Sequence, residues 1–237
     1  MKRAWIPNLL TFGNLTCGFV SIVFSGVSSY DRFFGAALLV LAAALLDGMD
    51  GQVARWLKTE SVLGKELDSL ADCVTFGVAP GYLAYRAYLS GMHVWFGNFG
   101  LDAGILLAAV FPICAAYRLA RFNVRSSPGS FSGLPSPAAA VLVVLGVIFF
   151  LNTGFHTALF AVLYCVVSFL MVSTITYSKP QATVFRRLRG VKLLGLIILV
   201  ALLLVFFRFG IVLIFVALYA ASGIVGFIIH LIEQRRY

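Results

Sequence analysis

The chain alternates between apolar runs of about 16 to 25 residues and short polar or basic segments. Runs of this length cross the roughly 30 Å hydrocarbon layer of a bilayer as helices, and the alternation typical of membrane barrel strands is absent. We therefore predict an all-α polytopic membrane protein with about eight transmembrane helices. The predicted spans cover about 14–29, 33–57, 66–90, 103–123, two segments ending near 151 and 177, 193–208 and 210–232.

Composition supports the membrane assignment, since 61% of the residues are hydrophobic and only 11% are charged. The net charge of +9 comes from basic residues in the loops, so nucleic acid is not an expected partner. With these spans, all of the 18 lysines and arginines except Arg32, Arg86 and Arg208 fall on one side. This bias predicts a multi-pass protein of the cytoplasmic membrane with both termini in the cytoplasm.

Four aspartates form the candidate chemical centre: Asp47, Asp50, Asp68 and Asp72. Each pair has helical spacing, so each projects from one face of its helix, and an antiparallel hairpin brings the pairs together. Ionisable groups inside a membrane are costly and indicate function, although caps or polar packing are structural alternatives. Carboxylates alone suit Mg²⁺, Mn²⁺ or Ca²⁺ rather than zinc. Their place in the cytoplasmic third suits a diphosphate whose lipid tail stays in the bilayer.

Residues beside the aspartates fit a phosphate ligand. Gly51 removes a side chain where a ligand could approach the helix, and Arg55 lies one turn further with a guanidinium that suits phosphate. Helix packing and an interfacial charge, respectively, are their structural alternatives. The four cysteines are widely spaced in apolar segments, so we expect inert thiols.

The order Asp47, Asp50-Gly51, Ala54-Arg55, Gly64, Asp68 and Asp72 resembles the complete signature of the CDP-alcohol phosphatidyltransferases, D-x2-D-G-x2-A-R-x8-G-x3-D-x3-D. This resemblance implies a six-helix core, placed here at 1–177, within a single membrane domain 1–237. Residues 178–237 would add a basic loop and a helical hairpin. It also implies two divalent cations held by the four aspartates, with Asp72 as general base, and a homodimer.

The resemblance continues in PNLLT at 7–11, which is similar to the family's element near the cytidine diphosphate. It implies these contacts to CDP-diacylglycerol: Asn8, Thr11, Gly51, Arg55 and Ser61. Asn14 departs from the pattern, because many members carry an arginine there. NLTCGF at 14–19, CAAYRLARFN at 114–123 and GLPSPAAA at 133–140 resemble the phosphatidylserine synthase branch.

The acceptor would then be L-serine, whose carboxylate suits a guanidinium. Arg118 and Arg121 lie three residues apart on one helix face, and Ser136 could complete a polar pocket. Anchoring by the positive-inside rule is the alternative role of the arginines. The expected reaction gives phosphatidylserine and CMP by direct attack, since His93, His156 and His230 lack the H-x-K-x4-D pattern of a phospholipase-D-like route.

Two alternatives remain open. The same chemistry could use another alcohol, namely glycerol 3-phosphate, inositol phosphate or choline. A cation transporter is more remote, because its acids should spread across both halves of the membrane domain, whereas these four cluster in one hairpin.

Overall fold

The computed structural model describes residues 5–57, 59, 61–96, 99–124, 131–153, 157–177 and 218 of the 237-residue chain. The predicted spans at 193–208 and 210–232, with the basic loop before them, lie outside these described residues, apart from the single helical residue Leu218. The description below therefore concerns the part of the chain that carries the four aspartates.

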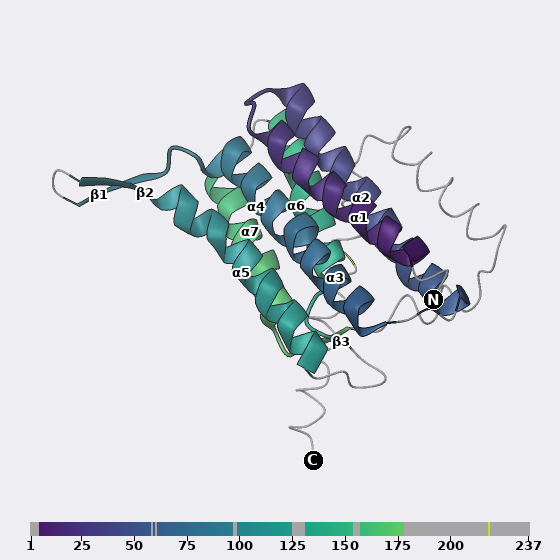
Figure 1. The fold of residues 1–237 in the computed structure, drawn as a ribbon. Helices are drawn as coiled ribbons and strands as arrows, with labels where there is room; N and C mark the ends of the chain where they lie inside the picture. Colours follow the sequence, from purple (N-terminus) through teal and green to yellow (C-terminus); the bar gives the residue numbers. More distant parts are fainter. Residues whose placement is uncertain are drawn as a thin grey trace, which may run out of the picture.

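Helices make up nearly all of this part of the chain, and they lie side by side as an elongated bundle (Figure 1). The α-helices are α1 (Trp5–Ser25), α2 (Tyr30–Leu57), α3 (Val62–Cys73), α4 (Ala79–Ala84), α5 (Ala103–Val124), α6 (Ser136–Thr153) and α7 (Thr157–Val172). The π-helical turns η1 (Val74–Val78) and η2 (Tyr85–Leu89) join α3 and α4 into one run from 62 to 89. The helical architecture predicted from the sequence is thus confirmed.

Two short ribbons accompany the helices, which the sequence did not predict. Strands β1 (His93–Phe96) and β2 (Phe99–Asp102) form an antiparallel hairpin that projects from the end of the bundle remote from the N-terminus (Figure 1). Strands β3 (Phe131–Ser132) and β4 (Thr176–Tyr177) pair next to the other end of α5.

Several predicted helix boundaries differ from the structure, and two of the differences have a clear structural basis. The first helix begins at Trp5 rather than near residue 14, because Pro7 lies in its first turn, where the missing N–H removes no helical hydrogen bond. The last described helix ends at Val172, and strand β4 takes up Thr176–Tyr177, which the sequence had assigned to the sixth span. The ends of α2 and α5 lie within three residues of the prediction.

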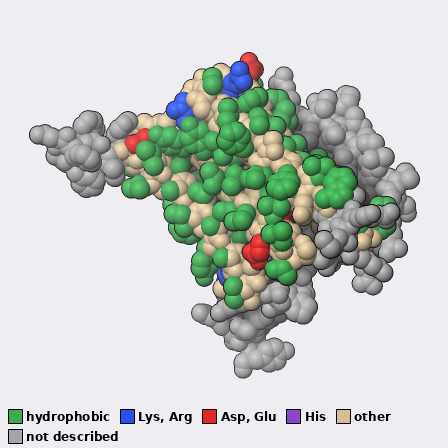
Figure 2. Space-filling view, in the orientation of Figure 1, with side chains coloured by type: hydrophobic (Ala, Val, Ile, Leu, Met, Phe, Trp, Pro, Cys, Tyr) green, Lys and Arg blue, Asp and Glu red, His purple; other side chains and the backbone are tan. Residues whose placement is uncertain are grey.

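Three of the helices, Pro7–Ser25, Tyr30–Val53 and Ala103–Val124, are long and apolar enough to cross a bilayer. Shorter apolar helices cover Ser136–Leu151 and Thr157–Val172. Hydrophobic side chains cover most of the visible face of the described residues (Figure 2). Large exposed apolar side chains such as Phe19, Ile113 and Phe169 would face lipid rather than water. The protein is therefore membrane-embedded.

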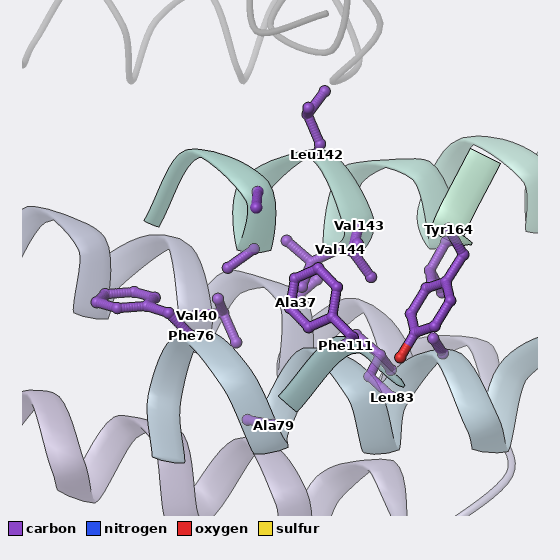
Figure 3. Packing of buried hydrophobic residues seen from close by; sticks show 14 of the residues in the cluster. Ala37, Val40, Phe76, Ala79, Leu83, Phe111, Leu142, Val143, Val144 and Tyr164 are labelled. Carbon is purple, nitrogen blue, oxygen red and sulfur yellow. The ribbon is translucent and has the colours of Figure 1, made fainter. Parts of the chain in front are cut away.

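The buried core lies between α2, the 62–89 run, α5, α6 and α7. Phe111, Leu83, Val143 and Val144 point into one shared space (Figure 3). Tyr164 is buried among them, and its hydroxyl donates a hydrogen bond of 2.6 Å to the Ala108 carbonyl. This packing fixes α5 and α6, which carry the candidate acceptor residues, against the helix that carries Asp68 and Asp72.

The π-helical turn η1 follows Asp72 by two residues and has a local cause. Pro80 has no N–H to donate to the Phe76 carbonyl, and its ring crowds the preceding turn, so the helix widens there. The adjacent helix α1 approaches η1 closely at Gly18, where a Cβ would lie 2.9 Å from Thr75 Cα. Glycine at this position lets α1 lie directly against the helix that carries the aspartates.

Candidate active site

Helices α2 and α3 bring three carboxylates together at one point. One oxygen from each of Asp47, Asp50 and Asp68 lies within 4.8 Å of the other two. Asp72 lies one turn beyond Asp68 and is buried, and its side chain is within hydrogen-bonding reach of Asp47. The structure thus unites the four aspartates that the sequence spacing had paired.

The donor set of this cluster fits a hard divalent cation. Asp68 Oδ1 is buried and has no hydrogen-bond partner among the described residues. A buried acceptor left in this state costs about 1–3 kcal/mol, and mutual repulsion of neighbouring carboxylates adds to that cost. A cation bound by oxygen ligands would relieve both costs.

Helix α1 supplies two polar side chains to the cluster. Thr11 Oγ1 lies 3.1 Å from Asp50 Oδ2 and 3.2 Å from the Pro7 carbonyl, so it donates to one of these two oxygens. Asn14 Nδ2 donates a hydrogen bond of 3.1 Å to Asp72 Oδ1. Both side chains are buried, so α1 orients one aspartate from each of the two acidic helices.

A cavity of about 540 Å³ opens beside the cluster. Its lining comes from α1, the end of α2, the connection and the start of α3: Pro7, Asn8, Thr11, Asp50, Gly51, Thr59, Ser61, Val62, Gly64, Lys65 and Asp68. Four of the five residues predicted to contact CDP-diacylglycerol are in this lining. The fifth, Arg55, belongs to α2, and its side chain lies outside the described part.

Thr59 and Lys65 also line the cavity, and the sequence analysis did not assign them to the site. A signal for them existed, since both lie in the short polar stretch of sequence that separates the two pairs of aspartates. Lys65 contributes a positive charge, and Thr59 contributes a buried hydroxyl without a hydrogen-bond partner among the described residues. These groups widen the set of donors that face an anionic ligand.

The start of α3 forms one wall of this cavity. Ser61 is the N-cap residue, and its hydroxyl accepts a hydrogen bond of 3.0 Å from the Gly64 N–H. A Cβ on Gly64 would lie 3.0 Å from Ser61 Oγ and 3.3 Å from Asn8 Oδ1, so glycine keeps this wall shallow. The first turn of a helix also favours negative charge, because its free N–H groups point outward.

A second polar group lies where α5 and α6 face the cluster. Arg118 Nη1 donates a hydrogen bond of 2.6 Å to Ser136 Oγ, and both residues are buried. The Arg118 guanidinium is close enough to Asp47 for electrostatic attraction. The structure therefore brings together two of the three residues predicted to bind serine, 18 positions apart in the chain.

Arg121, the third of these residues, makes different contacts. Its guanidinium donates to the carbonyls of Val172, Met171 and Ser173, at 2.8, 3.4 and 3.2 Å. These carbonyls end helix α7, where a cation is favourable. The geometry thus links Arg121 to helix termination, whereas Arg118 is linked to the acidic cluster.

Comparison with known proteins assigns the chain to a family. Residues 4–172 match the family model described as CDP-alcohol phosphatidyltransferase. The chain belongs to the CDP-alcohol phosphatidyltransferase family. The match spans α1 to α7 and so includes every residue of the acidic cluster, the cavity and the Arg118–Ser136 pair. Members of this family use divalent cations, and the group of Asp47, Asp50 and Asp68 could hold one.

Individual relatives within the CDP-alcohol phosphatidyltransferase family are similar over most of the chain. The CDP-diacylglycerol–serine O-phosphatidyltransferase of Helicobacter pylori is 39% identical over 237 residues, covering 96% of this chain and 92% of the relative. The protein of the same name from Bacillus subtilis is 37% identical over 174 residues, covering 73% and 89%. The archaetidylserine synthase of Methanothermobacter thermautotrophicus is 37% identical over 180 residues, covering 73% and 70%.

Proposed function

We propose that this protein transfers the phosphatidyl group of CDP-diacylglycerol to the hydroxyl of L-serine, giving phosphatidylserine and CMP. The observation that carries this proposal is that the acidic cluster is close both to a polar cavity and to a buried polar pair. The cavity of about 540 Å³ has Asp50 and Asp68 in its lining, and Arg118 of the buried Arg118–Ser136 pair is close enough to Asp47 for electrostatic attraction. The relatives named for serine as acceptor support the choice of alcohol.

The acidic cluster would hold two divalent cations, Mg²⁺ or Mn²⁺, with Ca²⁺ as a further candidate ion. Asp47, Asp50, Asp68 and Asp72 would be the ligands, and the buried Asp68 Oδ1 without a partner supports this role. When bound, the cations neutralise the diphosphate and stabilise the CMP that leaves. Thr11 keeps Asp50 oriented through its hydroxyl.

The cavity would bind the cytidine diphosphate end of the donor lipid. Asn8, Ser61 and the first turn of α3 offer hydrogen-bond donors, and Lys65 offers a positive charge. We assign Gly51 to close approach of the ligand, and Arg55 to its phosphates on its guanidinium chemistry, its place one turn beyond Gly51 and the family resemblance. The acyl chains would remain in the bilayer beside the apolar faces of the helices.

The reaction at phosphorus would be a direct displacement. Asp72 accepts the proton of the serine hydroxyl, whose oxygen forms a bond to the phosphorus on the lipid side of the diphosphate. The bond from that phosphorus to the bridging oxygen breaks, and CMP leaves with the electron pair. In such transfers, preorganised charges provide most of the stabilisation of the transition state.

The Arg118–Ser136 pair would hold the serine carboxylate. A guanidinium and a hydroxyl both donate hydrogen bonds, and a carboxylate has two oxygens to receive them. Arg118 also attracts Asp47, so a ligand bound there would lie beside the cluster. Arg121 is not included in this pocket, because its hydrogen bonds serve the end of α7.

The arrangement in the membrane is also a proposal. The one-sided distribution of lysines and arginines supports a cytoplasmic active site with both termini on that side. Eight spans, the last two forming an additional hairpin within 178–237, follow from the hydrophobic pattern, and a catalytic core at 1–177 follows from the family resemblance. A homodimer follows from the family resemblance alone.

The direct test supplies the purified protein with CDP-diacylglycerol and Mn²⁺ or Mg²⁺, and with serine, glycerol 3-phosphate, inositol phosphate or choline in turn. We expect phosphatidylserine and an equal amount of CMP with serine. A lipid product formed with another alcohol and not with serine would overturn the acceptor assignment. Asp72→Asn should abolish turnover while CDP-diacylglycerol still binds, and full activity of that variant would overturn the role of Asp72.

A further inference from the structure

Asn14 lies where α1 meets the helix that carries Asp72, and its side chain is fully buried. Its Nδ2 donates a hydrogen bond of 3.1 Å to Asp72 Oδ1. From the sequence, Asn14 stands out only as a departure from a family pattern, and it has no predicted role. The structure places it in contact with the group that would take the proton of the acceptor.

The backbone of Asn14 is attached to the same helix as Asp72. Thr75 Oγ1 donates a hydrogen bond of 3.1 Å to the Asn14 carbonyl, and Thr75 belongs to the π-helical turn η1. The close approach at Gly18 makes this contact sterically feasible. Asn14 and Asp72 are therefore linked through both side chain and backbone, which limits movement of one relative to the other.

The other end of the Asn14 amide is not satisfied by helix packing among the described residues. Asn14 Oδ1 is buried and has no hydrogen-bond partner among the described residues. A polar residue that only joined two helices would be expected to satisfy both ends of its amide. Here the donor end is directed at a carboxylate while the acceptor end stays unsatisfied, as occurs where function sets the geometry.

We propose that Asn14 is a positioning residue for Asp72, an inference that rests on the proposed function of Asp72 as the base. Its hydrogen bond to Oδ1 fixes the rotation of the carboxylate, so that a constant lone pair faces the hydroxyl of the acceptor. Thr75 holds Asn14 in place through the backbone. Loss of the amide would leave Asp72 chemically intact and incorrectly oriented.

The test compares Asn14→Leu, which has similar size and no donor, with Asn14→Gln, which keeps the amide. We expect kcat of Asn14→Leu to fall about 10- to 100-fold, as for partners that orient a functional group, with little change in KM for serine or CDP-diacylglycerol. Asn14→Gln should recover part of kcat. Thr75→Val should lower kcat in the same direction by a smaller factor, and it provides a second variant if Asn14→Leu does not fold.

Ser21→Ala is the matched control on α1, because Ser21 is equally buried and its hydroxyl donates to the Ala36 carbonyl at 2.9 Å, away from the site. We expect wild-type kcat for this variant. CDP-diacylglycerol binding and thermal unfolding are measured for every variant, and kcat is expressed per folded molecule. Unchanged kcat per folded Asn14→Leu would overturn the proposal, whatever the unfolding temperature.

A rise in KM for serine at constant kcat would also overturn it, since it would make Asn14 a contact of the acceptor. Asp72→Asn is assayed in parallel with serine. An inactive Asp72→Asn beside a fully active Asn14→Leu would reject the positioning role alone. An active Asp72→Asn would instead reject the proposed function of Asp72, on which the inference depends.

Discussion

The two sides of the acidic cluster are built in different ways. The lining of the cavity on the donor side comes from two stretches of the sequence, the first turns of α1 and the acidic hairpin from Asp50 to Asp68. The acceptor side comes from single residues of two further helices, Arg118 of α5 and Ser136 of α6. One side is thus set by local sequence, and the other depends on how α5 and α6 pack against the acidic hairpin.

Because of this difference, one part of the site should determine the reaction and another part should determine which alcohol is used. The aspartates and the donor-side cavity belong to one region, so a change there should affect every acceptor equally. The Arg118–Ser136 pair comes from other helices, and Arg118 is close enough to Asp47 of the cluster for electrostatic attraction. Changes in this pair should alter the use of serine while leaving CDP-diacylglycerol binding intact. The predictions below test this division.

The largest effect is expected at the cluster itself. Asp68→Asn removes a charge from the three carboxylates that lie within 4.8 Å of one another. We expect kcat to fall about 1,000-fold with any acceptor, since loss of one preorganised charge has effects of this order. The measurement is CMP release with serine and with a second alcohol. Binding of Mn²⁺, followed by calorimetry, should weaken in parallel.

Asp31→Asn is the control, because Asp31 is an exposed residue in the first turn of α2, at the opposite end of that helix. It should release CMP at the wild-type rate. Removal of divalent cations with a chelator should abolish activity of the wild-type protein, and Mn²⁺ or Mg²⁺ should restore it. If the Asp68→Asn variant bound Mn²⁺ and released CMP as the wild-type protein does, the acidic cluster would have no role in catalysis.

The next effect concerns the acceptor side. Arg118→Lys keeps the positive charge and loses the planar fork that donates to Ser136 and, in the proposed function, to the carboxylate. A hydrogen bond to a charged group contributes about 1.5–3 kcal/mol, so KM for serine should rise about 10- to 100-fold. KM for CDP-diacylglycerol should stay unchanged, as steady-state kinetics with each substrate varied would reveal.

Arg86→Lys is the control for this substitution, since Arg86 bonds to Gly26 and Ser28 at the end of α1 remote from the cluster. Its kinetic constants should match those of the wild-type protein. A rise in KM for CDP-diacylglycerol as large as that for serine would remove the distinction between the two sides. If Arg121→Lys raised KM for serine more than Arg118→Lys did, the acceptor site would have to be assigned to Arg121.

The contrast also explains what could be predicted from the sequence. The hydrophobic pattern located the helices, and helical spacing located the aspartates, because both signals are local. The donor-side residues Asn8, Thr11 and Ser61 were instead predicted from the family resemblance, and only Gly51 and Arg55 also had an argument from spacing and chemistry. Pairing Arg118 with Ser136 could be suggested from chemistry, but the role of Arg121 required the position of the end of α7, a long-range contact.

Other contacts could not be predicted from the sequence. Asn14 contacts Asp72 across 58 positions, and the contact depends on the close approach of α1 at Gly18. The π-helical turn before Pro80 could have been suspected from the proline, but its direct role in holding Asn14 could not. Such contacts depend on how the helices pack together, and the pattern of residues along a single helix does not indicate this packing.

A smaller effect is expected on the donor side from Gly64→Ala. The added Cβ would lie 3.0 Å from Ser61 Oγ and 3.3 Å from Asn8 Oδ1, so it would disturb the helix cap and narrow the cavity. Loss of a cap costs about 1 kcal/mol. If this free energy is lost from binding of CDP-diacylglycerol, KM for that substrate should rise about fivefold. KM for serine should not change.

Gly48→Ala is the matched control, because a Cβ on Gly48 meets nothing within 4 Å and the residue lies in the same acidic helix hairpin. Its KM for CDP-diacylglycerol should match that of the wild-type protein. Equal effects of Gly64→Ala on both substrates would show that the start of α3 supports the whole site rather than the donor side.

The smallest effect is expected for Lys65→Met, which removes a positive charge from the cavity wall and keeps the length of the side chain. Lys65 is exposed, so its attraction for the diphosphate is weakened by water and salt. We expect KM for CDP-diacylglycerol to rise about two- to threefold at low ionic strength, and the difference from wild type to vanish near 1 M salt.

Glu66→Gln, which changes the charge at the next exposed residue outside the cavity lining, should leave KM unchanged. A Lys65→Met effect that persisted at high salt would place this lysine in direct contact with a buried ligand. An effect that appeared in KM for serine would extend the acceptor side into the cavity.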